Sequence, residues 1–170
     1  MEKLTELYMA NKFEDFLRKD AFSAFSKVLR EIPMKQGIPD FVALGKPIGL
    51  DVVSTKSLYD YSFNDTAPSE TSESMHVWAF ELKLKNWKRA LYQAFRCKSF
   101  ADWVFVVLPS EKRSLALKNV DLFRSLDVGL CVFDLSSSQV EQLHVPEQNK
   151  RFFKPYREFA VDRLLAASVS

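Results

Sequence analysis

Glycine and cysteine are scarce in this chain, and each scarcity argues against a class of structure. The 170 residues include 4 glycines and 2 cysteines, but 15 phenylalanines. So few glycines leave little room for glycine turns, and the phenylalanines indicate a large packed core. Cys97 and Cys131 lack zinc-ligand spacing, which argues against both a disulfide framework and a structural zinc site. We expect both to be core thiols in a reducing compartment, the cytoplasm.

Long apolar runs and a strong net charge are also missing. No segment approaches the roughly 20 apolar residues that cross a bilayer, and the first residues contain no apolar stretch typical of a secretion signal. We therefore expect no membrane partner. The net charge of +2 does not by itself indicate a nucleic-acid ligand. A chain of 170 residues, 47% hydrophobic and 27% charged, instead predicts one folded domain over residues 1–170.

Charge is unevenly distributed along the chain. Residues 83–98 contain six basic side chains and no acidic one, whereas residues 54–76 contain four acids and one lysine. The basic stretch suits a surface that follows a phosphate backbone, and an ordinary solvated helix face is the alternative. The side chains that we expect to contact nucleic acid are Lys85, Lys88, Arg89 and Arg96.

Hydrophobic periodicity predicts helices and strands in an order that gives an α/β fold. A hairpin followed by strand–helix–strand crossovers implies a mixed central sheet flanked by helices. The polar tract at about 54–76 is expected to be a loop or insertion, and residues 48–53 could add a short strand. The predicted helices span 3–19, 111–125 and 156–167, and a further helix follows its cap at Asn86. The predicted strands span 27–32, 38–44, 76–84, 102–108 and 128–133.

Three charged residues lie in apolar segments where burial would be costly. Asp40 follows Ile38-Pro39, and Glu81 and Lys83 alternate with Phe80, Leu82 and Leu84. Alternation by two directs Glu81 and Lys83 to one face of a strand, where they must pair or bind an ion. Two carboxylates suit Mg²⁺, which activates water for phosphodiester hydrolysis, and an ammonium group can orient that water. The alternatives are a solvent-facing edge-strand pair for Glu81 and Lys83, and an ordinary strand start for Asp40.

Pro39-Asp40, Glu81-Leu82-Lys83 and a glutamine on the following helix, Gln93, resemble the PD-(D/E)xK nuclease superfamily. The resemblance spans about residues 3–134 and implies a restriction-endonuclease-like fold. It further implies that Asp40 and Glu81 bind Mg²⁺, with Mn²⁺ as a substitute, that Lys83 assists the water, and that Gln93 supports the site. Some members of the superfamily add a glutamate from the first helix to the metal site, for which Glu6 is the first choice and Glu14 the second.

The resemblance implies a Mg²⁺-dependent endonuclease that hydrolyses DNA. Forty residues separate Asp40 from Glu81, which is longer than usual for the superfamily and requires an insertion. A non-catalytic DNA-binding or assembly module with the same fold is the alternative, and a structure-specific RNA enzyme is a third possibility. A homodimer would allow two strands to be cut.

Overall fold

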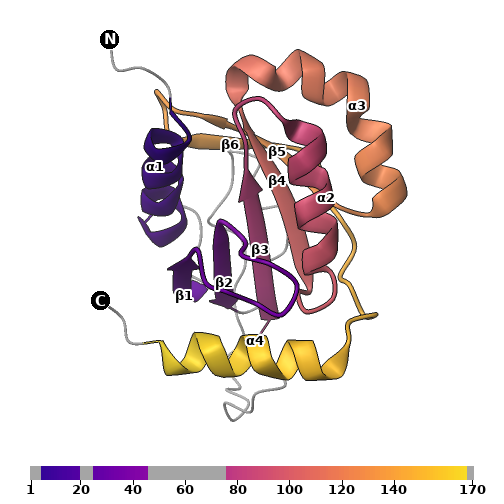
Figure 1. Ribbon diagram of the computed structural model, residues 1–170. Helices are drawn as coiled ribbons and strands as arrows, with labels where there is room; N and C mark the ends of the chain where they lie inside the picture. The colour runs from indigo at the N-terminus through magenta and orange to yellow at the C-terminus, as the bar shows by residue number, and fades with distance from the viewer. Residues whose placement is uncertain (1–4, 20–24, 46–75, 168–170) are drawn as a thin grey trace, which may run out of the picture.

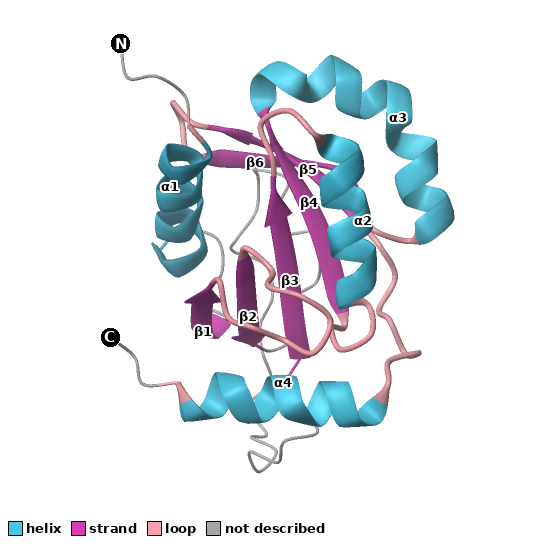
Figure 2. Cartoon of the chain, viewed as in Figure 1, coloured by secondary structure: helices cyan, strands magenta, loops and turns pink. Residues whose placement is uncertain are grey.

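A six-stranded mixed sheet forms the centre of the protein (Figures 1 and 2). The computed structural model describes residues 5–19, 25–45 and 76–167. The strands follow chain order across the sheet; β3, β4 and β5 are parallel neighbours, and the β1–β2, β2–β3 and β5–β6 pairs are antiparallel. Their bounds are β1 Phe25–Arg30, β2 Phe41–Gly45, β3 His76–Leu82, β4 Trp103–Pro109, β5 Gly129–Asp134 and β6 Gln139–His144.

Helices cover both faces of this sheet. The helix α1 (Glu6–Lys19) packs on one face, and α2 (Trp87–Cys97), α3 (Arg113–Leu126) and α4 (Lys154–Ala166) contribute buried residues to the core on the other. A short 3₁₀ helix, Ser110–Lys112, leads into α3. The α/β prediction with a mixed, helix-flanked sheet is therefore confirmed. No helix in the described ranges is both long and apolar enough to span a bilayer.

Aromatic side chains fill the core beneath α1. In the parallel β3–β4 pair, Trp78 lies beside Trp103 and Phe80 beside Phe105. Their ring centroids are 4.4 Å and 5.7 Å apart, respectively, and both pairs stack. The abundance of phenylalanine noted in the sequence therefore serves this face of the sheet.

The predicted hairpin is present, but its strand ends were wrong. The strand β1 stops at Arg30 and β2 starts at Phe41, so residues 31–32 and 38–40 lie outside the strands. Glu31 has a φ of 51°, which breaks the extended backbone, and Met34 and Gly37 pair in an isolated bridge within the connection. Asp40 consequently lies immediately before β2.

The strand β6 was not predicted. Its sequence, Gln-Val-Glu-Gln-Leu-His, buries only Val140 well, because β6 pairs with β5 alone and forms an edge of the sheet. The possible strand at 48–53 lies outside the described residues, as does all of the predicted 54–76 loop except His76.

The helix α2 begins as predicted. The Asn86 side chain accepts a hydrogen bond from the Arg89 backbone N–H, at 3.1 Å, and so caps the first turn. Ala90, Leu91 and Ala94 are buried against the sheet, as the helical periodicity predicted. Phe95 was expected on the same stripe, but it is exposed, because it lies at the edge of the stripe and nothing described covers it.

Candidate active site

Asp40 and Glu81 meet across the antiparallel β2–β3 pair. Phe41 is opposite Phe80 in the register, so one further step places Asp40 opposite Glu81. Asp40 Oδ2 accepts a hydrogen bond from the Leu82 backbone N–H at 2.7 Å, which fixes the carboxylate at this end of β3. The strand β3 lies between β2 and β4, so the solvent-facing edge-strand alternative for Glu81 is wrong.

Glu81 is a buried acid in an unfavourable setting. It is 1% exposed, on the sheet face that α2 covers, where Ala79 also lies. Burial is the largest cause that raises the Glu81 pKa to about 8, followed by the charge of Asp40, while Lys83 and Arg89 act in the opposite direction. Glu81 Oε2 has no hydrogen-bond partner among the described residues. An acceptor oxygen left in this state would be satisfied by a cation or a proton.

Lys83 brings an ammonium group to the same place. Its Nζ lies 3.6 Å from Asp40 Oδ2 and 3.8 Å from Glu6 Oε2. The Lys83 backbone N–H donates to the Val107 carbonyl at 3.2 Å, so the β3–β4 pairing continues one residue beyond β3 and holds the lysine in register. Glu6, in the first turn of α1, thus approaches the site from the other side of the sheet.

The structure distinguishes the two glutamates of α1, Glu6 and Glu14, that could contribute to the site. Glu14 forms ion pairs with Arg18 of α1 at 2.9 Å and with Arg30 of β1 at 3.8 Å, so its carboxylate links α1 to β1. Glu6 is the glutamate that lies beside Lys83.

Gln93 lies on the helix that covers Glu81. Its Oε1 is buried and has no hydrogen-bond partner among the described residues. The Cys97 Sγ donates to the Gln93 carbonyl at 3.5 Å, and burial, followed by the charge of Glu81, raises the pKa of the Cys97 thiol. Gln93 is therefore not a fully solvated helix residue, which was the alternative to a role in the site. Cys97 and Cys131 are both buried and free, as predicted.

The donor set fits a hard cation with few protein ligands. In the described part of the chain, no group of three or more His, Cys, Asp or Glu side chains could hold a metal ion. Mg²⁺ commonly binds one or two carboxylates and keeps several waters as its other ligands. The Asp40–Glu81 pair can supply those carboxylates. The unpartnered Oε2 of Glu81 is the observation that favours a cation here.

The side chains predicted to contact nucleic acid are on the surface. Lys85, Lys88, Arg89 and Arg96 are all exposed, and none forms an ion pair with another described residue. Two exposed aromatic residues lie among them, Tyr92 and Phe95. Neither ring was predicted from the sequence to lie at this surface. Their spacing of four and seven residues from Lys88 is the pattern that places all three on one helix face.

No protein-family model matches the chain, and no curated protein matches it either. The chain is similar in structure to the SPO1766 protein of unknown function from Silicibacter pomeroyi. The TM-score is 0.56 and the sequence identity 13%, over 97% of this chain and 86% of that one. A likeness at this identity shows a common fold and carries no information about activity.

Proposed function

We propose that the protein is a Mg²⁺-dependent endonuclease of the PD-(D/E)xK type that hydrolyses phosphodiester bonds in DNA. One observation carries the proposal: Asp40 and Glu81 face each other across β2 and β3, with the Lys83 ammonium 3.6 Å from Asp40 Oδ2. Further support comes from the chain order α1–β1–β2–β3–α2–β4, which is the order that the resemblance implies for a restriction-endonuclease-like core.

Each residue has a role that follows from its position. Asp40 and Glu81 would hold the metal ion, which when bound polarises the phosphate and lowers the pKa of a water. Lys83 orients the attacking water and balances negative charge that develops on the phosphate oxygens. Glu6, which the resemblance implies as a further metal ligand, pairs with Lys83 at 3.8 Å, and Gln93 supports the site from α2. Lys85, Lys88, Arg89 and Arg96 bind the substrate backbone.

The most informative test is incubation of the purified protein with labelled DNA and RNA panels, with and without Mg²⁺ or Mn²⁺. Asp40→Asn and Lys83→Met should lower metal-dependent cleavage by about 10²-fold or more, because each removes a group that acts on the reacting atoms. Asp15→Asn and Lys19→Met are matched controls, since Asp15 and Lys19 form an exposed pair on α1 at 3.4 Å. Cleavage that survives both Asp40→Asn and Lys83→Met would remove the proposal.

A non-catalytic DNA-binding or assembly module is the second candidate. It is favoured by the exposed basic side chains Lys85, Lys88, Arg89 and Arg96, which suit DNA binding whether or not the site is catalytic. DNA binding without Mn²⁺ or Mg²⁺ binding would identify the module. RNA cleavage in place of DNA cleavage would indicate the RNA enzyme instead. The cytoplasmic location and the homodimer remain predictions.

A further inference from the structure

The exposed face of α2 combines positive charge with aromatic rings. The helix contains no acidic residue. Five of its residues, spread over successive turns outside the buried stripe, are exposed. Tyr92 is 66% exposed and Phe95 is 44% exposed, which is unusual for large rings on a helix that packs on a core. The five outward residues are Lys88, Arg89, Tyr92, Phe95 and Arg96.

One end of this face adjoins the candidate active site. The helix α2 begins at Trp87, four residues after Lys83, and covers the sheet face on which Glu81 is buried. The helix extends about 16 Å from Trp87 to Cys97, given a rise of about 1.5 Å per residue. A chain bound along the outer face of α2 would therefore lead away from Lys83 over several nucleotides.

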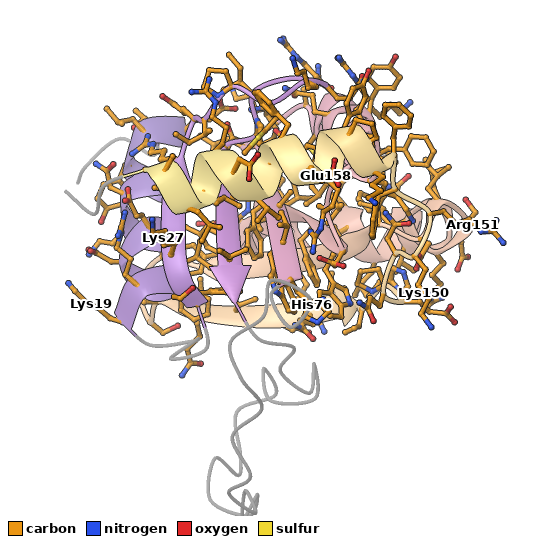
Figure 3. The ribbon with its side chains drawn as sticks, turned by 90° about the horizontal axis from the view of Figure 1, so that it is seen from below. Lys19, Lys27, His76, Lys150, Arg151 and Glu158 are labelled. Carbon is orange, nitrogen blue, oxygen red and sulfur yellow. The ribbon has the colours of Figure 1, made fainter. Side chains whose placement is uncertain are left out.

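The other end of the face continues onto the segment before α4. The Phe153 backbone N–H donates to the Ser99 carbonyl at 2.9 Å, and Asn149 Nδ2 donates to the Lys98 carbonyl at 2.6 Å. Phe153 is 56% exposed, and Lys150 and Arg151 are exposed beside it. Figure 3 shows Lys150 and Arg151 together at the end of the molecule where α4 begins. This segment thus repeats the combination of bases and an open aromatic ring.

We infer that these residues form a track for an unpaired strand of DNA that leads into the site at Lys83, an inference that rests on the proposed nuclease function. The track comprises Lys88, Arg89, Tyr92, Phe95 and Arg96 of α2 with Lys150, Arg151 and Phe153. Basic side chains attract any polynucleotide, but exposed rings gain most from unpaired bases, whose faces are free to stack on them. In a duplex the bases already stack on one another. The substrate class is therefore DNA with a single-stranded segment, such as a flap or an overhang.

Binding can be measured apart from cleavage by fluorescence anisotropy in EDTA, with a labelled oligothymidylate and a blunt duplex of equal length. We expect Tyr92→Ala with Phe95→Ala to weaken oligothymidylate binding by about tenfold or more and to change duplex binding little. Tyr92→Phe should keep the affinity, because the ring remains. Arg96→Gln should reduce the slope of log affinity against log salt concentration by about 0.7. Leu117→Ala with Leu122→Ala is the matched control, since these exposed side chains lie on α3.

Three results would overturn the track: no binding of oligothymidylate by the wild type, unchanged binding by the double aromatic variant, or an equal loss for the duplex. Tighter binding of oligouridylate than of oligothymidylate would overturn the assignment to DNA. The nuclease proposal fails separately, if the wild type binds the unpaired strand as expected but does not cleave it with Mg²⁺ or Mn²⁺.

Discussion

Glu81 is held where its negative charge is poorly supported. The carboxyl group is buried, faces Asp40, and leaves one oxygen without a hydrogen-bond partner among the described residues. A purely structural site of this kind would be better filled by an apolar residue. We therefore propose that Glu81 is half of a cation site, in which a metal would offset the repulsion from Asp40.

The raised pKa of Glu81 makes the stability of the metal-free protein depend on pH. The native state holds the proton up to about pH 8, whereas the unfolded chain releases it near pH 4.5. The free energy of unfolding should therefore be highest below pH 4.5 as far as Glu81 is concerned, and fall between pH 4.5 and 8, by on the order of a few kcal/mol.

Urea unfolding at several pH values in a chelator measures this dependence. Glu81→Gln should flatten the profile between pH 5 and 8, because the amide does not titrate. The exposed Glu111, changed to Gln, should leave the profile as in the wild type. Parallel profiles for the wild type and Glu81→Gln would contradict the assigned electrostatics of Glu81.

Among the secondary-structure elements, the C-terminal end of α4 depends on a side chain from β1. Lys27 Nζ donates to the carbonyls of Leu164, Leu165 and Ala167, at 2.9, 2.9 and 2.7 Å. A positive charge there also complements the helix dipole. The cap fixes α4 to the edge of the sheet that holds β1.

Replacing Lys27 with methionine keeps the apolar stem and removes the donor. Lys27→Met should lower the free energy of unfolding by about 1–2 kcal/mol and speed hydrogen exchange in the last turn of α4. Lys118→Met, on the exposed face of α3, is the control and should change stability little. Equal stability of the two variants would show that the cap contributes nothing.

The β4–β5 pair has room for only a hydrogen atom at Gly129. Gly129 is opposite Phe105 in the register, and a Cβ at this position would overlap the Phe105 ring. Gly129→Ala should cost about 1–3 kcal/mol through overpacking. In chemical denaturation, the same change should cost less in a Phe105→Leu background, and a cycle with no coupling would contradict the close contact.

Sequence patterns located the elements better than their ends or their exposed faces. The α2 stripe and the β4 strand, buried throughout, follow directly from apolar spacing. The edge strand β6 is too polar to stand out, and Phe95 could be placed only once the coverage of α2 was known.

For the protein as a whole, Asp102 joins parts of the fold that lie far apart in sequence. Its carboxylate accepts from the Val77 backbone N–H at 2.7 Å and pairs with Arg157 of α4 at 2.6 Å. Its backbone carbonyl accepts from the Asn149 N–H at 2.8 Å. Burial would raise the Asp102 pKa, but the hydrogen bond with His76 and the charge of Arg157 outweigh it, and the pKa is lowered.

Asp102→Ala should lower the free energy of unfolding by about 3–5 kcal/mol, because the partly buried Arg157 and the Val77 backbone N–H would both lose this carboxylate. Asp121→Ala is a chemically matched control: Asp121 pairs with Arg124 on the solvent side of α3 and should matter by less than about 1 kcal/mol. Urea unfolding at pH 7 compares them. A lowered acid pKa also predicts that the Asp102 contribution is lost as the pH falls through that pKa. Equal losses for the two variants would contradict the joining role.

Asp40 meets Glu81 and Lys83 because β2 and β3 are neighbours in the sheet, which the prediction required but no local pattern indicates. The closeness of Glu81 and Lys83 to each other could be anticipated from strand alternation. The choice between Glu6 and Glu14 could not, since it depends on how α1 docks: Arg30 of β1 engages Glu14 and leaves Glu6 for Lys83. The long-range contacts of Asp102 likewise depend on where α4 returns to the sheet, and no local pattern records that.

Calorimetric titration with Mn²⁺ tests the central claim most directly, because it asks whether the facing carboxylates bind a divalent cation at all. We expect one Mn²⁺ per wild-type chain, no binding by Asp40→Asn or Glu81→Gln, and unchanged binding by Asp15→Asn. Wild-type protein that binds no Mn²⁺, or binding that survives both substitutions, would contradict the account.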